Sequence, residues 1–259
     1  MPNELYIQWI GFSTLVSREI RRIIRIWPQT LLPPIITMLL YFIVFGNLIG
    51  GRIGPMNQLP YINFITPGLV MMSIINNSYI NVSSSFFSAK FQNCIEELLV
   101  SPMSNHAIIL GYVISGIFRG LITATLTLVI ALFFTKIHIQ NISLTIFMAV
   151  LTAMLFSLAG MVNGVFAKKF DDVAIIPMFI LTPLTYLGGV FYSTSLLPIF
   201  WQKVSLANPI LYIINGFRYA IFGSSDVTIA LALVILTSSV VGLYLLAWYL
   251  MGRGIGLKR

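Results

Sequence analysis

The side chains that could act as acids, bases, nucleophiles or metal ligands are few in this 259-residue chain. His106 and His138 stand at opposite ends of an apolar stretch, so we do not expect them to share a metal ion. The single cysteine, Cys94, excludes an internal disulfide. We therefore predict no catalytic and no metal site. The carboxylates all fall outside the long apolar stretches: Glu4, Glu19, Glu96, Glu97, Asp171, Asp172 and Asp226.

Motifs for nucleotide chemistry are also missing. The chain has no G-x-x-x-x-G-K-[ST] phosphate loop, and the dipeptide Gly-Lys does not occur in it. It has neither H-E-x-x-H nor G-x-S-x-G. Carriers coupled to protons or sodium usually hold a carboxylate inside the membrane, and none is placed there. We therefore expect no cofactor on this chain and a source of energy outside it.

The segment 90–104 combines acidic and apolar residues on an otherwise basic side of the protein. Residues 91–99 are expected to form a short amphipathic helix that Pro102 ends. Such a surface suits docking into a groove of a soluble partner, and an ordinary loop helix is the alternative. The candidate docking residues, whose apolar members we expect to be exposed, are Phe91, Ile95, Glu96, Glu97, Leu98, Leu99, Ser101 and Pro102.

A second candidate site consists of polar residues within apolar stretches. Those between 73 and 88 recur every three or four positions, which places them on one helical face. Arg119 is the only charge inside an expected span, and it should face protein, water or the membrane interface. This polar set either joins helices to one another or lines a transport path. Its candidate residues are Ser73, Asn77, Asn81, Ser84, Arg119 and Thr123.

The composition indicates that most of the chain lies within the lipid bilayer. Hydrophobic residues make up 58% of the chain and charged residues 8%, against about 25% charged in soluble proteins. The mean hydropathy is +0.94. A soluble enzyme, a nucleic-acid-binding domain and a disordered protein are thereby excluded. The net charge of +8 fits cytoplasmic loops of a membrane protein better than a nucleic-acid partner.

The expected fold is an all-α membrane protein with six transmembrane helices. Five uncharged stretches between charged residues each exceed the roughly 20 residues of one crossing, and a sixth crossing is expected between Glu97 and Lys136, where it contains Arg119. Two shorter apolar segments, 195–206 and 210–222, are expected to be re-entrant or interfacial helices before the last span. The regions are an N-terminal amphipathic segment over residues 1–27, a transmembrane domain over 28–250 and a cytoplasmic tail over 251–259. The expected spans are 28–49, 61–86, 106–134, 143–166, 174–192 and 228–250.

Residues 3–27 are predicted to form an amphipathic helix on the membrane surface, with a helix packed on a partner protein as the alternative. Its arginines fall largely outside the apolar stripe. The stripe consists of Leu5, Trp9, Phe12, Val16, Ile20, Ile23 and Trp27.

The distribution of Lys and Arg places both termini in the cytoplasm by the positive-inside rule. The opposite side is expected to carry Arg52, Lys136, Lys203 and Arg218. The cytoplasmic side is expected to carry Arg18, Arg21, Arg22, Arg25, Lys90, Lys168, Lys169, Arg253, Lys258 and Arg259.

Short motifs occur in a characteristic order along nearly the whole chain. They include PPIITM (33–38), FGNLIG (45–50), PGL (67–69), EELLVSP (96–102), FSLAG (156–160), FAK (166–168), FDD (170–172), TPLTYLGGVFY (182–192), NP (208–209) and GFRY (216–219). In order and spacing these motifs resemble permeases of the ABC-2 family of ATP-driven exporters. The resemblance implies six spans, cytoplasmic termini in a bacterial inner membrane, a coupling helix after the second span and re-entrant helices before the sixth. It also implies two permease copies with two ATP-binding-cassette subunits, which carry ATP and Mg.

The resemblance leaves the substrate open, because the family exports lipids, polysaccharides and drugs. Membrane lipid is expected around the spans. A secondary carrier or channel without an ATPase is the alternative function, and a membrane-embedded enzyme is another. The expectation that two copies of the chain form a homodimer comes from the resemblance. The spacing of Gly116 and Gly120 permits the close helix approach that such a contact uses.

Overall fold

The computed structural model describes residues 4–56 and 59–256, and these residues form helices and no β-strand. The all-α class is therefore confirmed for the described residues. The outermost residues of the regions 1–27 and 251–259, Lys258 and Arg259 among them, lie outside it. The helices are α1 (Glu4–Arg25), α2 (Trp27–Tyr41), a π-helical stretch (Phe42–Ile49), α3 (Gly50–Ile53), α4 (Tyr61–Phe91), α5 (Cys94–Val100), α6 (Asn105–Phe134), α7 (Ile142–Phe166), α8 (Phe170–Ile176), a second π-helical stretch (Pro177–Leu181), α9 (Thr182–Leu187), a 3-10 turn (Thr194–Leu196), α10 (Ile199–Leu206), α11 (Pro209–Phe222) and α12 (Ile229–Arg253).

Five helical stretches among the described residues are long and apolar enough to cross a membrane. They match five of the six predicted spans to within a few residues. The remaining predicted span, 61–86, lies in α4, which has 31 residues but is more polar than the others. The five stretches are Trp27–Ile53, Asn105–Phe134, Ile142–Phe166, Phe170–Leu187 and Ile229–Arg253.

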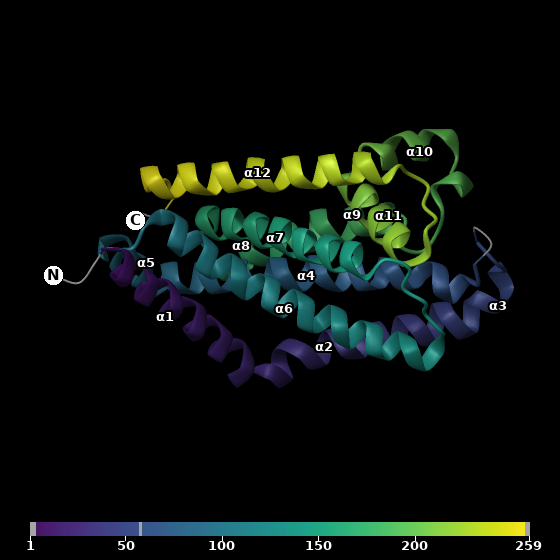
Figure 1. Cartoon of the computed structure of the whole chain (residues 1–259), viewed down its shortest axis with the longest axis horizontal. Coiled ribbons are helices and arrows are strands. Elements are labelled where there is room, and N and C mark those ends of the chain that lie inside the picture. The colour runs from purple at the N-terminus through teal and green to yellow at the C-terminus, as the bar shows by residue number, and fades with distance from the viewer. Residues whose placement is uncertain (1–3, 57–58, 257–259) are drawn as a thin grey trace.

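Helix α4 lies in the middle of the bundle, where α6 and α7 pack along it (Figure 1). Most of its residues are buried, including the polar Ser73 and Asn77. Because protein covers this helix, its polar side chains can bond to other helices and need not face lipid. This position explains why α4 is less apolar than the other long helices.

The bundle has two distinct ends (Figure 1). The start of α1, the short helix α5 and the end of α12 lie together at one end, which we call the α5 end. Helices α3 and α10 lie at the opposite end, the α3 end. The start of the first described helix and the end of the last one therefore lie at the same end of the bundle.

Glycines allow the central helices to approach closely. A methyl group on Gly116 would collide with Ser157 and Val82, and one on Gly120 with Ser78. These neighbours belong to α4 and α7 of the same chain. The two glycines therefore serve packing within the chain and lend no support to a contact between two copies.

Gly160 of α7 makes the tightest of these approaches to backbone, because a methyl group there would collide with the carbonyl oxygen of Tyr79. Backbone in the middle of α4 cannot move aside as a side-chain tip can. We expect Gly160→Ala to lower the free energy of unfolding by about 2 kcal/mol. The control is Gly242→Ala in α12, where nothing lies within 4 Å of the added methyl group. Thermal unfolding of both variants in detergent measures the difference, and equal melting temperatures would contradict this packing.

Helix α1 packs against α6, and its buried residues include Leu15, Glu19 and Ile23. The residues of the predicted apolar stripe therefore differ in exposure. Ile23 is buried against the bundle, whereas Trp9 and Trp27 are 64% and 53% exposed and remain available to a membrane interface. The orientation of α1 on a membrane stays a prediction.

The two short apolar segments predicted before the last span form α10 and α11. Helix α11 is inserted among α4, α7 and α12. Arg218, counted among the cations of the side opposite the termini, lies on this helix and is 1% exposed. Its guanidinium donates to the Gly189 carbonyl at 2.8 Å and to Asn215 Oδ1 at 3.1 Å, and it lies 3.9 Å from the centroid of the Phe64 ring.

Candidate functional site

Helix α5 follows a sharp corner at the end of α4. Asn93 at this corner has a φ of +60°, a left-handed conformation in which asparagine is enriched among non-glycine residues. At the other end of α5, Ser101 Oγ donates to the Leu98 carbonyl at 2.6 Å. The helix spans Cys94–Val100 and begins later than predicted, because Phe91 still belongs to α4.

The two faces of α5 differ in exposure. Ile95 is 1% exposed, and Leu98 and Leu99 are partly buried against the same core. The expectation that Ile95 is exposed is therefore wrong, and it holds only in part for the two leucines. Apolar residues on this face hold the short helix on the bundle. The outer face carries the exposed acids 96–97 and Val100, which is 88% exposed.

The corner before α5 is bonded to two other helices. Lys90 Nζ donates to the carbonyls of Val165 and Ala167 at 2.6 and 2.9 Å. Both carbonyls lie at the C-terminal end of α7, so Lys90 caps that helix. The ring of Phe91 lies 5.3 Å from that of Phe170 at the start of α8. A displacement of α5 would therefore be transmitted to α4, α7 and α8 together.

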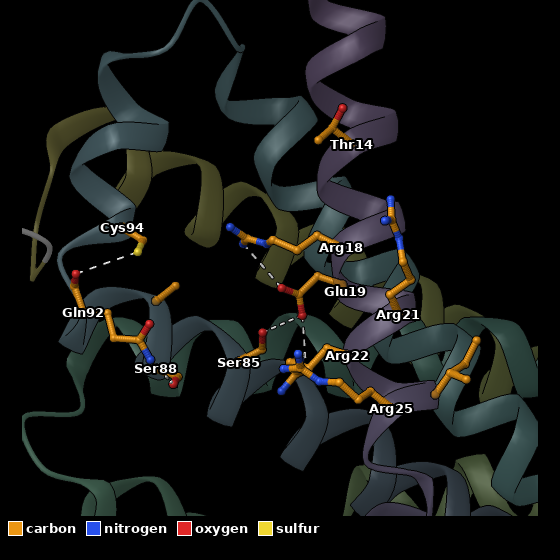
Figure 2. Close-up of a pocket in the computed structure, with 12 residues that line it drawn as sticks. Thr14, Arg18, Glu19, Arg21, Arg22, Arg25, Ser85, Ser88, Gln92 and Cys94 are labelled. Carbon is orange, nitrogen blue, oxygen red and sulfur yellow. Dashed lines mark hydrogen bonds and ion pairs between the residues drawn. The ribbon is translucent and has the colours of Figure 1, made fainter.

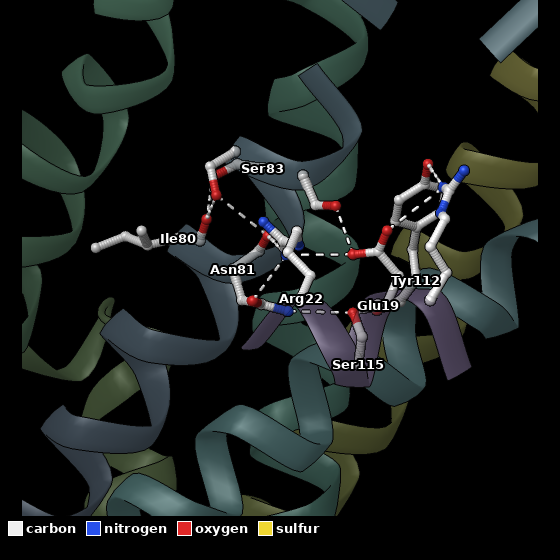
Figure 3. Close-up of polar contacts among 10 residues, drawn as sticks. Glu19, Arg22, Ile80, Asn81, Ser83, Tyr112 and Ser115 are labelled. Carbon is white, nitrogen blue, oxygen red and sulfur yellow. Dashed lines mark hydrogen bonds and ion pairs between the residues drawn. The ribbon is translucent and has the colours of Figure 1, made fainter. Parts of the chain in front are cut away.

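A charged network joins α1 to α4 and α6 (Figure 3). Glu19 accepts a hydrogen bond from Ser85 Oγ at 2.5 Å and pairs with Arg22 at 3.2 Å. Arg22 donates to Asn81 Oδ1 at 3.0 Å, and Asn81 in turn donates to Ser115 Oγ at 3.1 Å. Since a buried charge is stable only when it is paired and hydrogen-bonded, this network fixes the position of α1 on the bundle.

Arg119 makes a further set of polar contacts, at Asn77 of α4, one helical turn before Asn81. Its guanidinium donates to the Thr30 carbonyl of α2 and to Asn77 Oδ1 of α4, both at 3.3 Å. These two bonds direct the guanidinium toward α2 and α4, as expected for an arginine that faces protein. Thr30 is three residues after Trp27, where the first membrane-spanning stretch begins, so Arg119 lies near one end of that span.

The other predicted polar residues are less engaged. Ser73 is fully buried, and its hydroxyl has no partner among the described residues. Ser84 bonds to the Ile80 carbonyl of its own helix, and Thr123 likewise bonds within α6. The structure thus joins Asn77, Asn81 and Arg119 into helix–helix contacts but leaves Ser84 and Thr123 outside them. These bonds favour the helix–helix interpretation of the polar set.

Sequence reasoning missed the buried acid Glu19 and the capping role of Lys90. One signal for Glu19 was present, because Glu19 and Arg22 are spaced as a helical i,i+3 ion pair. The contacts of Lys90 join segments 75 residues apart, and no local pattern indicates them. Among the described residues, no group of three or more His, Cys, Asp or Glu could hold a metal ion.

An all-helical bundle with several apolar helices of spanning length defines a multi-pass integral membrane protein. Comparison with known proteins gives its family. Residues 11–222 match the ABC-2 type transporter family, and the chain belongs to it. It is therefore a membrane transport permease of the ATP-binding-cassette type.

Relatives support the same family. The chain is 54% identical over 254 residues to the inner membrane transport permease YadH of Escherichia coli strain K12, which covers 98% of this chain and 99% of that protein. The YadH of Shigella flexneri shows the same identity and coverage. Nodulation protein J of Sinorhizobium fredii strain NGR234 is 23% identical over 182 residues, covering 70% of this chain and 69% of that protein.

Proposed function

We propose that the chain is the membrane-spanning subunit of an ATP-driven exporter and receives its energy from a separate ATP-binding-cassette subunit at α5. The observation that carries this proposal is the outer face of α5, where two acids and the 88%-exposed Val100 stand at one end of the bundle. An apolar residue so exposed suits burial in a partner's groove, and the acids suit basic groups around it. ATP and Mg would be bound by the partner.

The contacts behind α5 support a coupling role. The corner at Asn93 joins α5 directly to α4, and Lys90 joins the same corner to α7. A partner that moves on binding ATP would thus displace the helices at the centre of the bundle, which is what rocking between inward-open and outward-open states requires.

Membrane topology follows from the bundle in this proposal. Helix α4 crosses the membrane as the second of six spans, because its 31 residues exceed the length of a crossing and protein covers its polar face. The α5 end lies in the cytoplasm of a bacterial inner membrane, since it carries the basic residues of α1 together with Lys90, Lys168 and Arg253. Helices α10 and α11 then lie on the outer side as interfacial or re-entrant helices.

The proposed assembly holds two copies of this chain and two ATPase subunits. The substrate class is a lipid, a glycan or a drug-like molecule. An ATP-independent carrier is the alternative, and the absence of a carboxylate from the expected spans argues against it. Glu19, the one buried acid in the described residues, is held by a hydrogen bond from Ser85 and an ion pair with Arg22.

The test is co-expression of the full chain with an ATP-binding-cassette subunit encoded beside its gene. We expect the two to co-purify, native mass spectrometry to give two copies of each, and reconstitution to raise the rate of ATP hydrolysis. Efflux of a solute from vesicles by the permease alone, with no ATPase bound and no effect of ATP, would establish the carrier instead.

A further inference from the structure

An open cavity of about 890 Å³ lies between α1 and the end of α4, beside the start of α5 (Figure 2). Four arginines of α1 line one wall. The opposite wall is formed by Ser85, Ser88, Gln92 and Cys94. The cavity therefore brings together guanidinium groups on one side and hydroxyl and amide groups on the other, which is a donor set suited to an anion.

The four arginines are not equally engaged. Arg18 and Arg22 both pair with the buried carboxylate of Glu19, at 3.4 and 3.2 Å. Arg21 and Arg25 are exposed and have no hydrogen bond or ion pair with any described residue. One carboxylate cannot neutralise four guanidinium groups, so the cavity keeps a net positive charge and two arginines that are free to bind.

The depth of the cavity points to a membrane lipid. Arg25 lies two residues before Trp27, where the first spanning stretch begins, and the exposed Trp27 is a typical interfacial residue. The cavity is therefore at the level of lipid headgroups. Its lining also includes Ile24, which is 57% exposed, and Ala89, so that apolar surface adjoins the charged groups.

We propose that this cavity binds the phosphodiester headgroup of an anionic phospholipid through Arg21 and Arg25. Basic pockets between helices on the cytoplasmic side are the usual form of such sites. The headgroup would bridge α1 to the end of α4, next to the network of Glu19, and so hold α1 on the bundle. The proposal does not depend on an ATPase partner, because every residue in it belongs to this chain.

The affinity for lipid tests the proposal on the full chain. Native mass spectrometry of delipidated protein is expected to show saturable binding of dioleoylphosphatidylglycerol and weaker binding of dioleoylphosphatidylcholine. The double variant Arg21→Gln, Arg25→Gln should weaken the first binding by roughly 20-fold, since each basic group near a membrane surface contributes several-fold. The control Lys168→Gln, Lys169→Gln removes the same charge at the same end of the bundle but outside the cavity. Equal losses in both variants would show a general charge effect and overturn the site.

The native Cys94 locates the bound lipid, because it lines the cavity and is the only cysteine of the chain. Its alkylation by N-ethylmaleimide should be slower in nanodiscs that contain phosphatidylglycerol than in pure phosphatidylcholine. The protection should disappear in the Arg21→Gln, Arg25→Gln variant and persist in the control. Protection by millimolar inorganic phosphate in phosphatidylcholine nanodiscs, equal to that by the anionic lipid, would assign the site to a soluble phosphate and overturn the lipid. No protection by either would overturn the site altogether.

Discussion

Replacement of Val100 by aspartate is expected to abolish co-purification of the ATPase subunit while the permease itself remains folded. Val100 is 88% exposed on the last turn of α5, so its side chain makes little contact within the chain that could be lost. A charge placed where the partner's groove should bury an apolar group typically costs about 2 kcal/mol or more, roughly 30-fold in affinity. The measurements are the amount of ATPase retained by the purified permease and the stimulated rate of ATP hydrolysis.

The choice of Val100 follows from the structure. Leu98 would have been the natural target from sequence, but it is partly buried against the core, and Leu98→Asp would also disturb folding. The matched control is Ile255→Asp, which places the same charge on an exposed apolar residue just after α12, whose end also lies at the α5 end of the bundle. Retention of the ATPase by Val100→Asp, with loss in Ile255→Asp, would move the docking surface away from α5.

The contribution of the acid pair should be smaller. Glu97→Gln removes an exposed charge at the rim of the proposed interface, and such changes act mainly on association rate and salt dependence.

A cross-link from Val100→Cys, in a background with Cys94→Ser, locates the partner directly. Cross-links that reach the ATPase only from α1 and never from α5 would contradict the assignment.

Helices with strong local signals could be predicted from the sequence. The apolar stretches that became α6, α7 and α12 are bounded by charged or polar residues, and the structure begins and ends them within a few positions of the prediction. The polar spacing of Asn77 and Asn81 likewise placed both on an inward face, because lipid offers amides no partners. Periodicity and the cost of unpaired polar groups were sufficient for these features.

Features that depend on contacts between distant segments could not be predicted. Ile95 has the composition of a docking residue, and only the position of α5 against the core shows that it is buried. Glu19 lies among arginines on a helix that the sequence predicts to lie on the membrane surface. It is nevertheless 3% exposed, because Ser85 of α4 lies against it and donates a hydrogen bond to its carboxylate. In each case burial was decided by tertiary packing, which the local pattern does not contain.

Arg218 is the largest fully buried side chain of the described residues, and it organises the α3 end of the bundle. Through Asn215, whose Oδ1 also accepts the backbone N–H of Asp226 at 3.2 Å, it is connected to the segment that leads into α12. The carboxylate of Asp226 in turn accepts a hydrogen bond from Ser193 Oγ at 2.9 Å. One guanidinium thus connects α11, the turn at Gly189 and the residues before the last span.

We therefore expect Arg218→Leu to lower the free energy of unfolding by about 3 kcal/mol, because two buried acceptors lose their donor and the cation–π contact with Phe64 is lost. The melting temperature in detergent should fall by roughly 10 °C. Arg218→Lys should recover only part of this loss, since a lysine cannot present a planar fork to both acceptors. The control Arg52→Leu removes an exposed arginine from α3 at the same end of the bundle and should leave the melting temperature nearly unchanged. A melting temperature of Arg218→Leu equal to that of the control would show that the buried guanidinium does not hold α11 in place.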